Sequence, residues 1–232
     1  MTNASKKDLV DYLSGIINEQ RRELLQNILA QRTRHITVVL EDIYQSQNAS
    51  AVLRTCECLG IQALHIIENH NEHQINPAIV QGASKWIEIN RYKDITKNNT
   101  VACLQMLKQR DYKIAATTLK AEATELGDLP IDEKIALCFG SEENGLSDKA
   151  IDMADYFVKI PMHGFTQSFN ISVSAGISLY HLITRLHNSD IDWHLNEQEK
   201  TDLYIDWLVK STPTGAVLMH KFLQEYKGTF DE

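Results

Sequence analysis

Three short segments of this 232-residue sequence combine glycine, amide, hydroxyl and charged residues in a way that could do chemistry. They are EDIYQSQNASAVLR at 41–54, CFGSEENGLS at 138–147 and KIPMHGFTQSFNIS at 159–172. The first places Arg54, a permanent cation, in an otherwise apolar stretch, and the second places Glu142 between two glycines. Side chains of these types can bind polar ligands and stabilise a developing negative charge.

Several common catalytic signatures are missing from the sequence. G-x-G-x-x-G does not occur among the ten glycines, GSEENGLS lacks the Gly-Lys-Ser/Thr end of a phosphate-binding loop, and no G-x-S-x-G is present. Hydride transfer, nucleoside triphosphate hydrolysis and serine hydrolysis therefore lose their usual sequence support. The four cysteines follow neither disulfide nor zinc spacing, so we expect structural thiols in a reducing cytoplasm and no metal site.

Composition is that of an ordinary soluble globule, with 43% hydrophobic and 23% charged residues. The net charge of −8 argues against global attraction to nucleic acid. Residues 1–40 nevertheless carry six Lys or Arg against four acids, a net +2, whereas 188–232 carry nine acids against four Lys, a net −5. No run approaches the roughly 18 apolar residues of a membrane helix, and no signal peptide is apparent, so no membrane partner is expected.

Alternating strands and helices must position the three segments. Strands are expected at 35–43, 64–68, 86–92, 112–119, 134–140 and 156–162. Helices are expected over 5–31, from Asn48 onward, and at 101–110, 148–154, 169–186, 196–209 and 214–226. This pattern predicts an α/β fold with a mostly parallel sheet, in which ligands collect beyond the carboxyl ends of the strands. We expect a core at 33–187 with helical extensions at 1–32 and 188–232.

The three segments resemble a known set of motifs when they are taken in order. Asn48, Ala51 and Arg54, then GSExxGLS at 140–147, then IPM and SxNxS within 160–172, are similar to the three motifs of the SPOUT-class RNA ribose 2'-O-methyltransferases. Any one motif alone is weak, but three in this order and spacing are specific.

Within this class, the sequence is most similar to the branch that methylates guanosine in the tRNA D-loop. The segment GASKW at 82–86 and both helical extensions match that branch as well. The resemblance covers most of residues 18–210. It implies S-adenosylmethionine-dependent methylation of a ribose 2'-hydroxyl in tRNA, with guanosine 18 as the target. It also implies a deep trefoil knot near the C-terminal part of the core and an obligate homodimer whose active sites use residues of both chains.

The resemblance assigns catalytic roles to five residues, each with a plain alternative. Arg54 would be the central cation; because arginine stays protonated in nearly every setting and is a poor base, we favour phosphate binding and alkoxide stabilisation over a role as base. The alternative is a surface arginine. Asn48 would fix Arg54 or the ribose, or only cap its helix. Glu142 would anchor the active-site loop and pair with an arginine of the partner chain, or be a solvent-facing turn acid. Asn170 and Ser168 would orient substrate, or cap the helix that follows.

Cofactor and RNA contacts follow from the same resemblance. Thr117, Gly140, Ile160 and Phe169 would contact S-adenosylmethionine, largely through backbone, although Phe169 stands where the family more often has leucine. Candidate tRNA phosphate contacts are Arg21, Arg22, Arg32 and Arg34, each of which could equally be a solvated charge.

Rival functions stay open at this point. The nearest keeps the chemistry and changes the substrate to another tRNA position or to ribosomal RNA. A non-catalytic RNA-binding dimer is a second rival, and intact Arg54, Glu142 and Asn170 speak against it. An unrelated α/β small-molecule enzyme is disfavoured by the missing nucleotide motifs.

Overall fold

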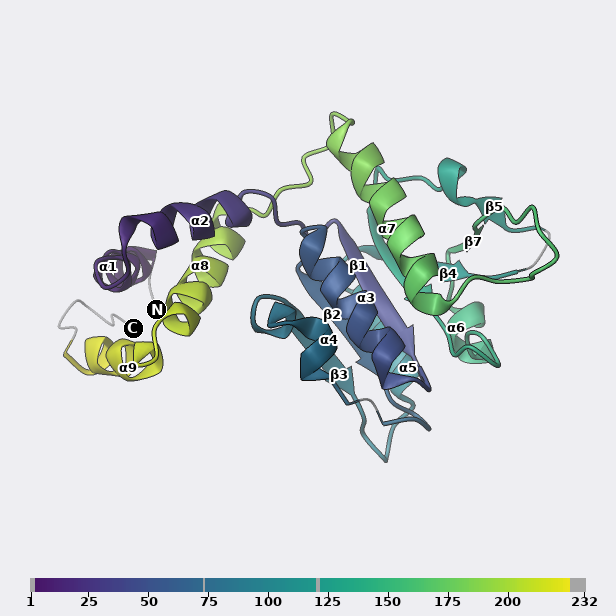
Figure 1. The fold of residues 1–232 in the computed structure, drawn as a ribbon, viewed down its shortest axis with the longest axis horizontal. Helices are drawn as coiled ribbons and strands as arrows, with labels where there is room; N and C mark the ends of the chain where they lie inside the picture. The colour runs from purple at the N-terminus through teal and green to yellow at the C-terminus, as the bar shows by residue number, and fades with distance from the viewer. Residues whose placement is uncertain (1–2, 73, 120–121, 226–232) are drawn as a thin grey trace. The chain divides into compact units, whose positions relative to one another are not determined.

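The computed structural model describes residues 3–72, 74–119 and 122–225, which form two compact units (Figure 1). One unit comprises residues 33–193 and contains the whole sheet. The other is helical and combines residues 3–32 with 194–225. None of the helices in these described stretches has the length and hydropathy of a membrane span.

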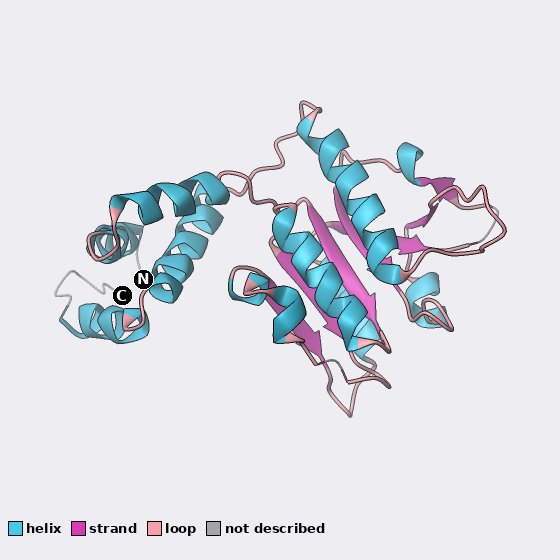
Figure 2. Ribbon diagram, viewed as in Figure 1, coloured by secondary structure: helices cyan, strands magenta, loops and turns pink. Residues whose placement is uncertain are grey.

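The larger unit is built on a seven-stranded sheet in the order β3-β2-β1-β6-β4-β7-β5, in which every neighbouring pair is parallel (Figure 2). The strands are β1 (Ile36–Glu41), β2 (Ala63–Ile67), β3 (Glu88–Tyr92), β4 (Tyr112–Thr117), β5 (Thr124–Glu125), β6 (Lys134–Phe139) and β7 (Tyr156–Lys159). The predicted α/β fold with a mostly parallel sheet is confirmed.

Helices cover both faces of this sheet, as parallel strands require. They are α3 (Ser46–Cys58), α4 (Pro77–Val80), α5 (Asn99–Lys108), α6 (Asp148–Asp152) and α7 (Ile171–His187), with 3₁₀ turns η1 (Ala83–Lys85) and η2 (Leu126–Asp128). In Figure 1, α3 and α7 lie side by side over one face, where they contact each other. The strand β1 is buried along its entire length: Val38 and Leu40 pack with α3 and α7, and Val39 packs with α5 on the opposite face.

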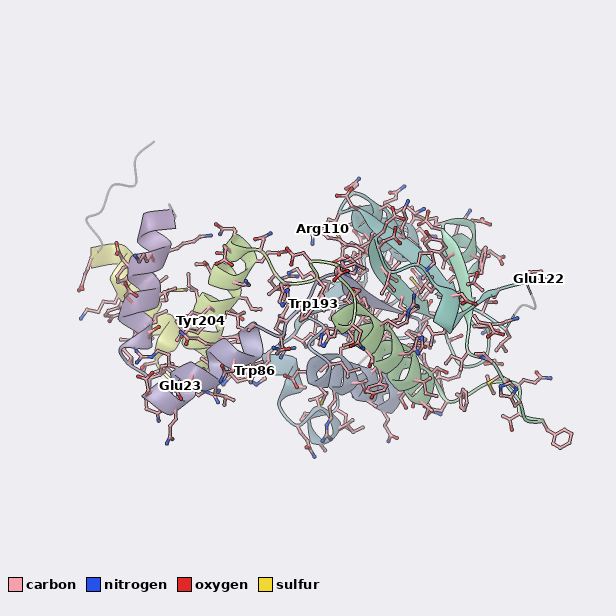
Figure 3. All side chains as sticks on the ribbon, turned by 90° about the horizontal axis from the view of Figure 1, so that it is seen from above. Glu23, Trp86, Arg110, Glu122, Trp193 and Tyr204 are labelled. Carbon is pink, nitrogen blue, oxygen red and sulfur yellow. The ribbon has the colours of Figure 1, made fainter. Side chains whose placement is uncertain are left out.

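The helical unit holds α1 (Asn3–Ser14), α2 (Glu19–Leu29), α8 (Glu197–Ser211) and α9 (Gly215–Glu225). Trp207 is 1% exposed and is the largest fully buried side chain of the described residues. Tyr204 of α8 is also buried, whereas Glu23 of α2 is exposed to solvent; Figure 3 labels both. Amphipathic helices therefore form a small core of their own here.

Some element boundaries differ from the sequence expectation. The helix expected over 5–31 is divided, because α1 ends at Ser14 and the Asn18 side chain caps α2 by accepting the Arg21 N–H at 2.8 Å. The larger unit extends past the expected limit at 187, since His187 stacks on Trp193 with ring centroids 4.3 Å apart.

Elements shorter than a full helix or strand were missed. The turns α4 and η1 and the two-residue strand β5 are too short to show a period in sequence. The third strand begins at Glu88 rather than at Trp86, because η1 and the turn after it occupy the preceding residues.

Acid should weaken this fold through one buried histidine. His65 lies within β2 and is 3% exposed; burial, with the nearby cations Arg110 and Arg34, lowers its pKa from 6.5 to about 4. Above pH 6.5 the ring is neutral in both states. As pH falls from 6.5 towards 4, the unfolded chain binds a proton that the folded chain excludes, so stability declines.

We therefore predict that the free energy of unfolding falls by up to roughly 3 kcal/mol between pH 7 and pH 4 because of His65. Urea unfolding at a series of pH values would measure this, with His65→Gln as the comparison. The variant should lose most of this slope between pH 6.5 and 4. Equal slopes for the two proteins would contradict the assignment.

Candidate functional site

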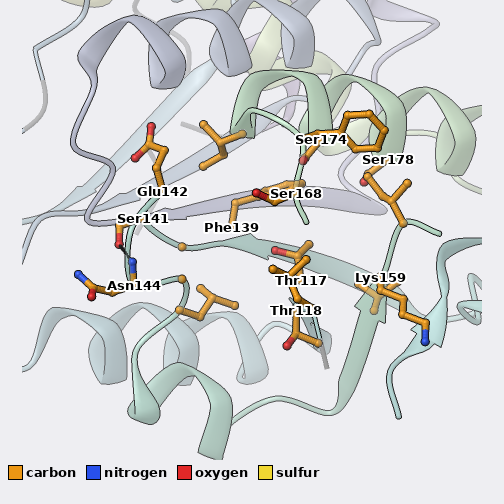
Figure 4. A pocket seen from close by; sticks show the side chains of 18 of the residues that line it. Thr117, Thr118, Phe139, Ser141, Glu142, Asn144, Lys159, Ser168, Ser174 and Ser178 are labelled. Carbon is orange, nitrogen blue, oxygen red and sulfur yellow. Dashed lines mark hydrogen bonds between the residues drawn. The ribbon is translucent and has the colours of Figure 1, made fainter. Parts of the chain in front are cut away.

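A pocket of about 650 Å³ lies beyond the carboxyl ends of β4, β6 and β7. Its walls are the end of β4, the turn 140–147 after β6, the segment 160–170 after β7 and the first turns of α7 (Figure 4). This is the edge at which parallel α/β sheets bind ligands, and the volume is in the range of small-molecule sites. The described residues contain no group of three or more His, Cys, Asp or Glu placed to hold a metal ion.

The turn 140–147 is a tight backbone loop. Ser141 and Gly145 exchange two backbone hydrogen bonds, of 3.0 and 2.9 Å, and Gly145 has a φ of 69°. A β-carbon on Gly140 would lie 2.0 Å from the carbonyl carbon of Gly145. Glycine at position 140 is therefore needed for the chain to close this loop, whose lip carries Glu142.

A polar cluster joins three segments at the mouth of the pocket. The Asn48 amide Nδ2 donates to Glu142 Oε1 at 2.6 Å and to Gln45 Oε1 at 3.3 Å, and the Asn170 Nδ2 donates to Asn48 Oδ1 at 3.1 Å. Asn48 is only 8% exposed. The three sequence segments singled out for chemistry thus meet at one point, through side chains of types suited to binding a hydroxyl-bearing ligand.

The capping alternatives for the two asparagines have different outcomes. The helix α3 starts at Ser46 with Gln45 as its N-cap, so the interpretation of Asn48 as a cap is wrong. Asn170, by contrast, does cap α7: its Oδ1 accepts the Ser172 N–H at 2.8 Å and the Ser172 hydroxyl at 2.6 Å. Capping and the bond to Asn48 use different atoms of Asn170, so the residue does both.

The residues expected to contact a cofactor lie in one place. The pocket is lined by Thr117, Gly140, Ile160 and Phe169, together with Glu142, Ser168 and Asn170. Thr117 is oriented by its hydroxyl, which donates to the Cys138 carbonyl at 2.8 Å. Phe169 is 40% exposed.

Arg54 is not part of this cluster within a single chain. Its side chain is exposed, and its Nη1 donates to the Ile79 carbonyl of α4 at 3.4 Å. The contact with Ile79 places the guanidinium against α4, and Arg54 is not among the residues that line the pocket.

Two of the four candidate RNA-binding arginines are engaged elsewhere. Arg32 is 1% exposed, with its guanidinium carbon 5.2 Å above the centre of the Trp207 ring, a packing and cation–π role that differs from the expected phosphate contact. Arg34 forms a two-pronged ion pair with Glu88, in which one N–O distance is 2.8 Å.

Arg21 and Arg22 lie in the first turns of α2 and are half-buried. Arg22 pairs with Glu19, one turn earlier on the same helix. Both arginines belong to the helical unit.

The buried thiols near the sheet are structural. Burial raises the pKa of Cys138 beyond its usual range, and burial likewise raises the pKa of Cys103 to about 12. These thiols stay neutral at physiological pH, in keeping with the structural role expected from sequence.

One functional candidate was missed by the sequence reasoning. Glu41, the last residue of β1, is 2% exposed and accepts hydrogen bonds from Ser147 at the end of the turn 140–147. A charged residue at the end of the largely apolar run ITVVL was the available signal.

Comparison with known proteins agrees with this geometry. The SpoU rRNA Methylase family matches residues 35–180. The chain is 44% identical to a tRNA (guanosine(18)-2'-O)-methyltransferase of Borreliella burgdorferi over 198 residues, which is 85% of this chain and 88% of that protein.

Solved structures resemble it as well. The TrmH/SpoU tRNA modifying enzyme of A. aeolicus superposes with a TM-score of 0.73 at 29% identity, covering 84% of this chain and 98% of that one. The SpoU methyltransferase AviRb of Streptomyces viridochromogenes, solved in complex with the cofactor AdoMet, shares the fold at a TM-score of 0.58 and 19% identity, over 70% and 65% of the two chains.

We predict that Gly140→Ala destabilises the protein by at least about 2 kcal/mol, because the new methyl group overlaps the backbone of Gly145 and cannot be relieved by a rotamer change. Gly164→Ala is the matched control, since a β-carbon there meets nothing within 4 Å. Urea unfolding would compare the two. Equal midpoints for both variants would show that the turn can open at little cost.

Proposed function

We propose, from the premise that this chain belongs to the SpoU rRNA Methylase family, that it is an S-adenosylmethionine-dependent tRNA ribose 2'-O-methyltransferase. The observation that carries the proposal is the Asn48–Glu142–Asn170 cluster at the mouth of the pocket. The proposed target is guanosine 18 of the D-loop. Identity of 44% with a relative of that named activity, over 85% of this chain, supports this choice.

The pocket suits S-adenosylmethionine in size and shape. A volume of about 650 Å³ accommodates a molecule of that class, and Gly140 is one of the residues that line it. Thr117, Ile160 and Phe169 would contact it. When bound, S-adenosylmethionine supplies the methyl group as a sulfonium.

The polar cluster can orient the ribose. Asn48 has both N–H groups directed at Gln45 and Glu142 and its carbonyl at Asn170, so its amide is fixed. Asn170 uses one N–H on Asn48, and its second N–H can donate to a ribose oxygen. Ser168 offers a further hydroxyl beside it. The 2'-hydroxyl would be held by donors whose positions exist before substrate arrives, which lowers the entropic cost of reaction.

Arg54 would complete the site from a second copy of the chain. An arginine side chain stays protonated in nearly every protein setting and is therefore a poor base, so we assign Arg54 to binding the adjacent phosphate and stabilising the developing alkoxide. Glu142 uses Oε1 to accept from Asn48, and its Oε2 can pair with a guanidinium from the second copy. Arg54 is exposed on its own chain, and this supports the proposal that its guanidinium enters the pocket of a second copy.

A homodimer is proposed to form through α7. Val173, Ile177 and Tyr180 of α7 are exposed by 46, 38 and 65%, and their spacing puts them on one side of the helix. Phe169, two residues before the start of the helix, is 40% exposed. An apolar stripe of this kind marks an interaction surface. Phe169 lines the pocket, so a partner on this face would lie next to the site.

The proposal also covers the tRNA contacts, the knot and the location of the protein. The helical extensions would contact tRNA, with Arg21 and Arg22 as phosphate contacts. Arg34, which belongs to the larger unit, is a weaker candidate because of its ion pair. The trefoil knot stays a prediction that rests on the family resemblance. A cytoplasmic location fits a tRNA substrate.

We predict that the protein transfers labelled methyl from S-adenosylmethionine to unmodified tRNA, giving 2'-O-methylguanosine by nucleoside mass spectrometry. Arg54→Ala should lower the rate by roughly a hundredfold or more, as expected for removal of a charge-stabilising group. Arg110→Ala is the matched control, because this exposed arginine lies before β4, at the opposite edge of the sheet.

The outcomes separate the rival functions. Label in another ribose-methylated nucleoside, or only in ribosomal RNA, would move the target and keep the chemistry. Absence of label on any RNA would refute the enzymatic proposal and leave an RNA-binding dimer.

A second prediction concerns the shared site. Arg54→Ala and Asn170→Ala should each be inactive, but heterodimers purified through two different tags should regain about half of the wild-type rate, since one of the two sites then has both residues intact. No recovery would indicate that Arg54 acts within its own chain.

A further inference from the structure

Glu41 is a buried carboxylate for which the proposed reaction has no use. It ends β1, next to β6 in the middle of the sheet, and its side chain is 2% exposed. In the β1–β6 register Leu40 pairs with Phe139, so Glu41 lies level with Gly140 at the edge of the pocket. Burying a carboxylate is costly unless hydrogen bonds compensate it, so a charge here requires an explanation.

Three donors from two other elements satisfy this carboxylate. Oε2 accepts the Ser147 N–H at 2.8 Å, and Oε1 accepts the Ser147 hydroxyl at 2.7 Å and the hydroxyl of Thr100 in α5. Thr100 in turn accepts from the Asn69 amide at 2.9 Å. The carboxylate thus ties β1 to α5 on one side and to the end of the turn 140–147 on the other.

The hydrogen bond from the Ser147 hydroxyl to Glu41 also fixes the orientation of that hydroxyl. Because its hydroxyl hydrogen points at Glu41, its oxygen lone pairs face the Ala150 N–H, which donates to it at 3.2 Å. Ser147 is the N-cap of α6. One residue therefore ends the turn, begins α6 and is held at both its N–H and its hydroxyl by Glu41.

The turn 140–147 is consequently held at three points. Gly140 continues directly from β6, Glu142 is bonded to Asn48, and Ser147 is bonded to Glu41. Glu41 is the last residue of β1 and Asn48 lies in the first turn of α3, the next helix along the chain, so two consecutive elements anchor the middle and the end of the turn. Residues 140–146 of this turn line the pocket, and Ser147 follows them directly.

We propose that Glu41 is a positioning residue that sets the shape of the cofactor pocket by holding the far end of this turn, an inference that rests on the function proposed above. The role requires a carboxylate. Its two oxygens accept from three donors and donate nothing, whereas a glutamine would turn an NH₂ group towards one of those donors.

Four single variants separate positioning from plain stability. Glu41→Gln removes the charge at constant shape, and Ser147→Ala removes the hydroxyl on the turn. Thr100→Val deletes the α5 donor to the same carboxylate and leaves both Ser147 bonds, which makes it the stability-matched control. Ser147→Thr restores a hydroxyl, and the exposed position of residue 147 leaves room for the methyl group.

Two measurements are made on each full-length variant. Calorimetry gives the dissociation constant for S-adenosylhomocysteine, and hydrogen exchange gives the protection of amides 141–147 in the free protein. Glu41→Gln should weaken binding by about tenfold and increase exchange in the turn, while Thr100→Val changes binding by less than about threefold. Ser147→Ala should weaken binding to a smaller extent, Ser147→Thr should restore it, and the effects of Glu41→Gln and Ser147→Ala should not add.

Several results would overturn the inference. One is unchanged turn exchange in both Glu41→Gln and Ser147→Ala. Another is a binding loss in Thr100→Val equal to that in Glu41→Gln at equal melting temperature. If the wild-type protein bound no S-adenosylhomocysteine, the proposed function would fail, and the exchange data alone would still decide whether Glu41 holds the turn. If Glu41→Gln did not fold, the comparison of Ser147→Ala with Ser147→Thr would decide it.

Discussion

The close approach of backbone to backbone between Gly140 and Gly145 is the constraint on which the rest of the site depends. No side chain fits at position 140, and the turn folds back so that Ser141 and Gly145 satisfy each other's backbone groups. The turn therefore stands as a thin wall beyond the sheet and presents Glu142 at its lip. A wall of this kind has few contacts of its own, so its position depends on the side chains that hold it from outside.

The sheet order supplies those side chains. With β1, β6, β4 and β7 adjacent and parallel, the connections that follow them all emerge at the same edge. Asn48 thereby reaches Glu142, 94 residues later, and Asn170 reaches Asn48 across 122 residues. Burial of the sheet on both faces keeps these strand ends in place, since apolar clusters lie above and below β1. The polar contacts are few, but each joins two rigid elements.

The single chain has two features that are unusual for a self-sufficient enzyme. The arginine of the first motif, Arg54, is exposed and bonded to α4, away from the pocket. The helix α7, which forms part of the pocket wall, presents Val173, Ile177 and Tyr180 as an exposed apolar stripe. Both features favour a shared site in a dimer, because association would cover the stripe and bring a guanidinium to the pocket from the second copy.

Sequence alone determined the fold class, most strand positions and the three segments that meet at the site, because strand periodicity and glycine turns are local properties. Only tertiary structure decided what each polar side chain does. Asn48 is hydrogen-bonded to Gln45, Glu142 and Asn170 and does not cap its helix. Arg32 packs on a tryptophan and does not face solvent. Glu41, missed in the sequence, holds a turn that lies 106 residues further along the chain. Such roles depend on contacts between distant segments, which no local pattern encodes. They also depend on burial, which decides whether a charged side chain faces water, binds substrate or stabilises the fold.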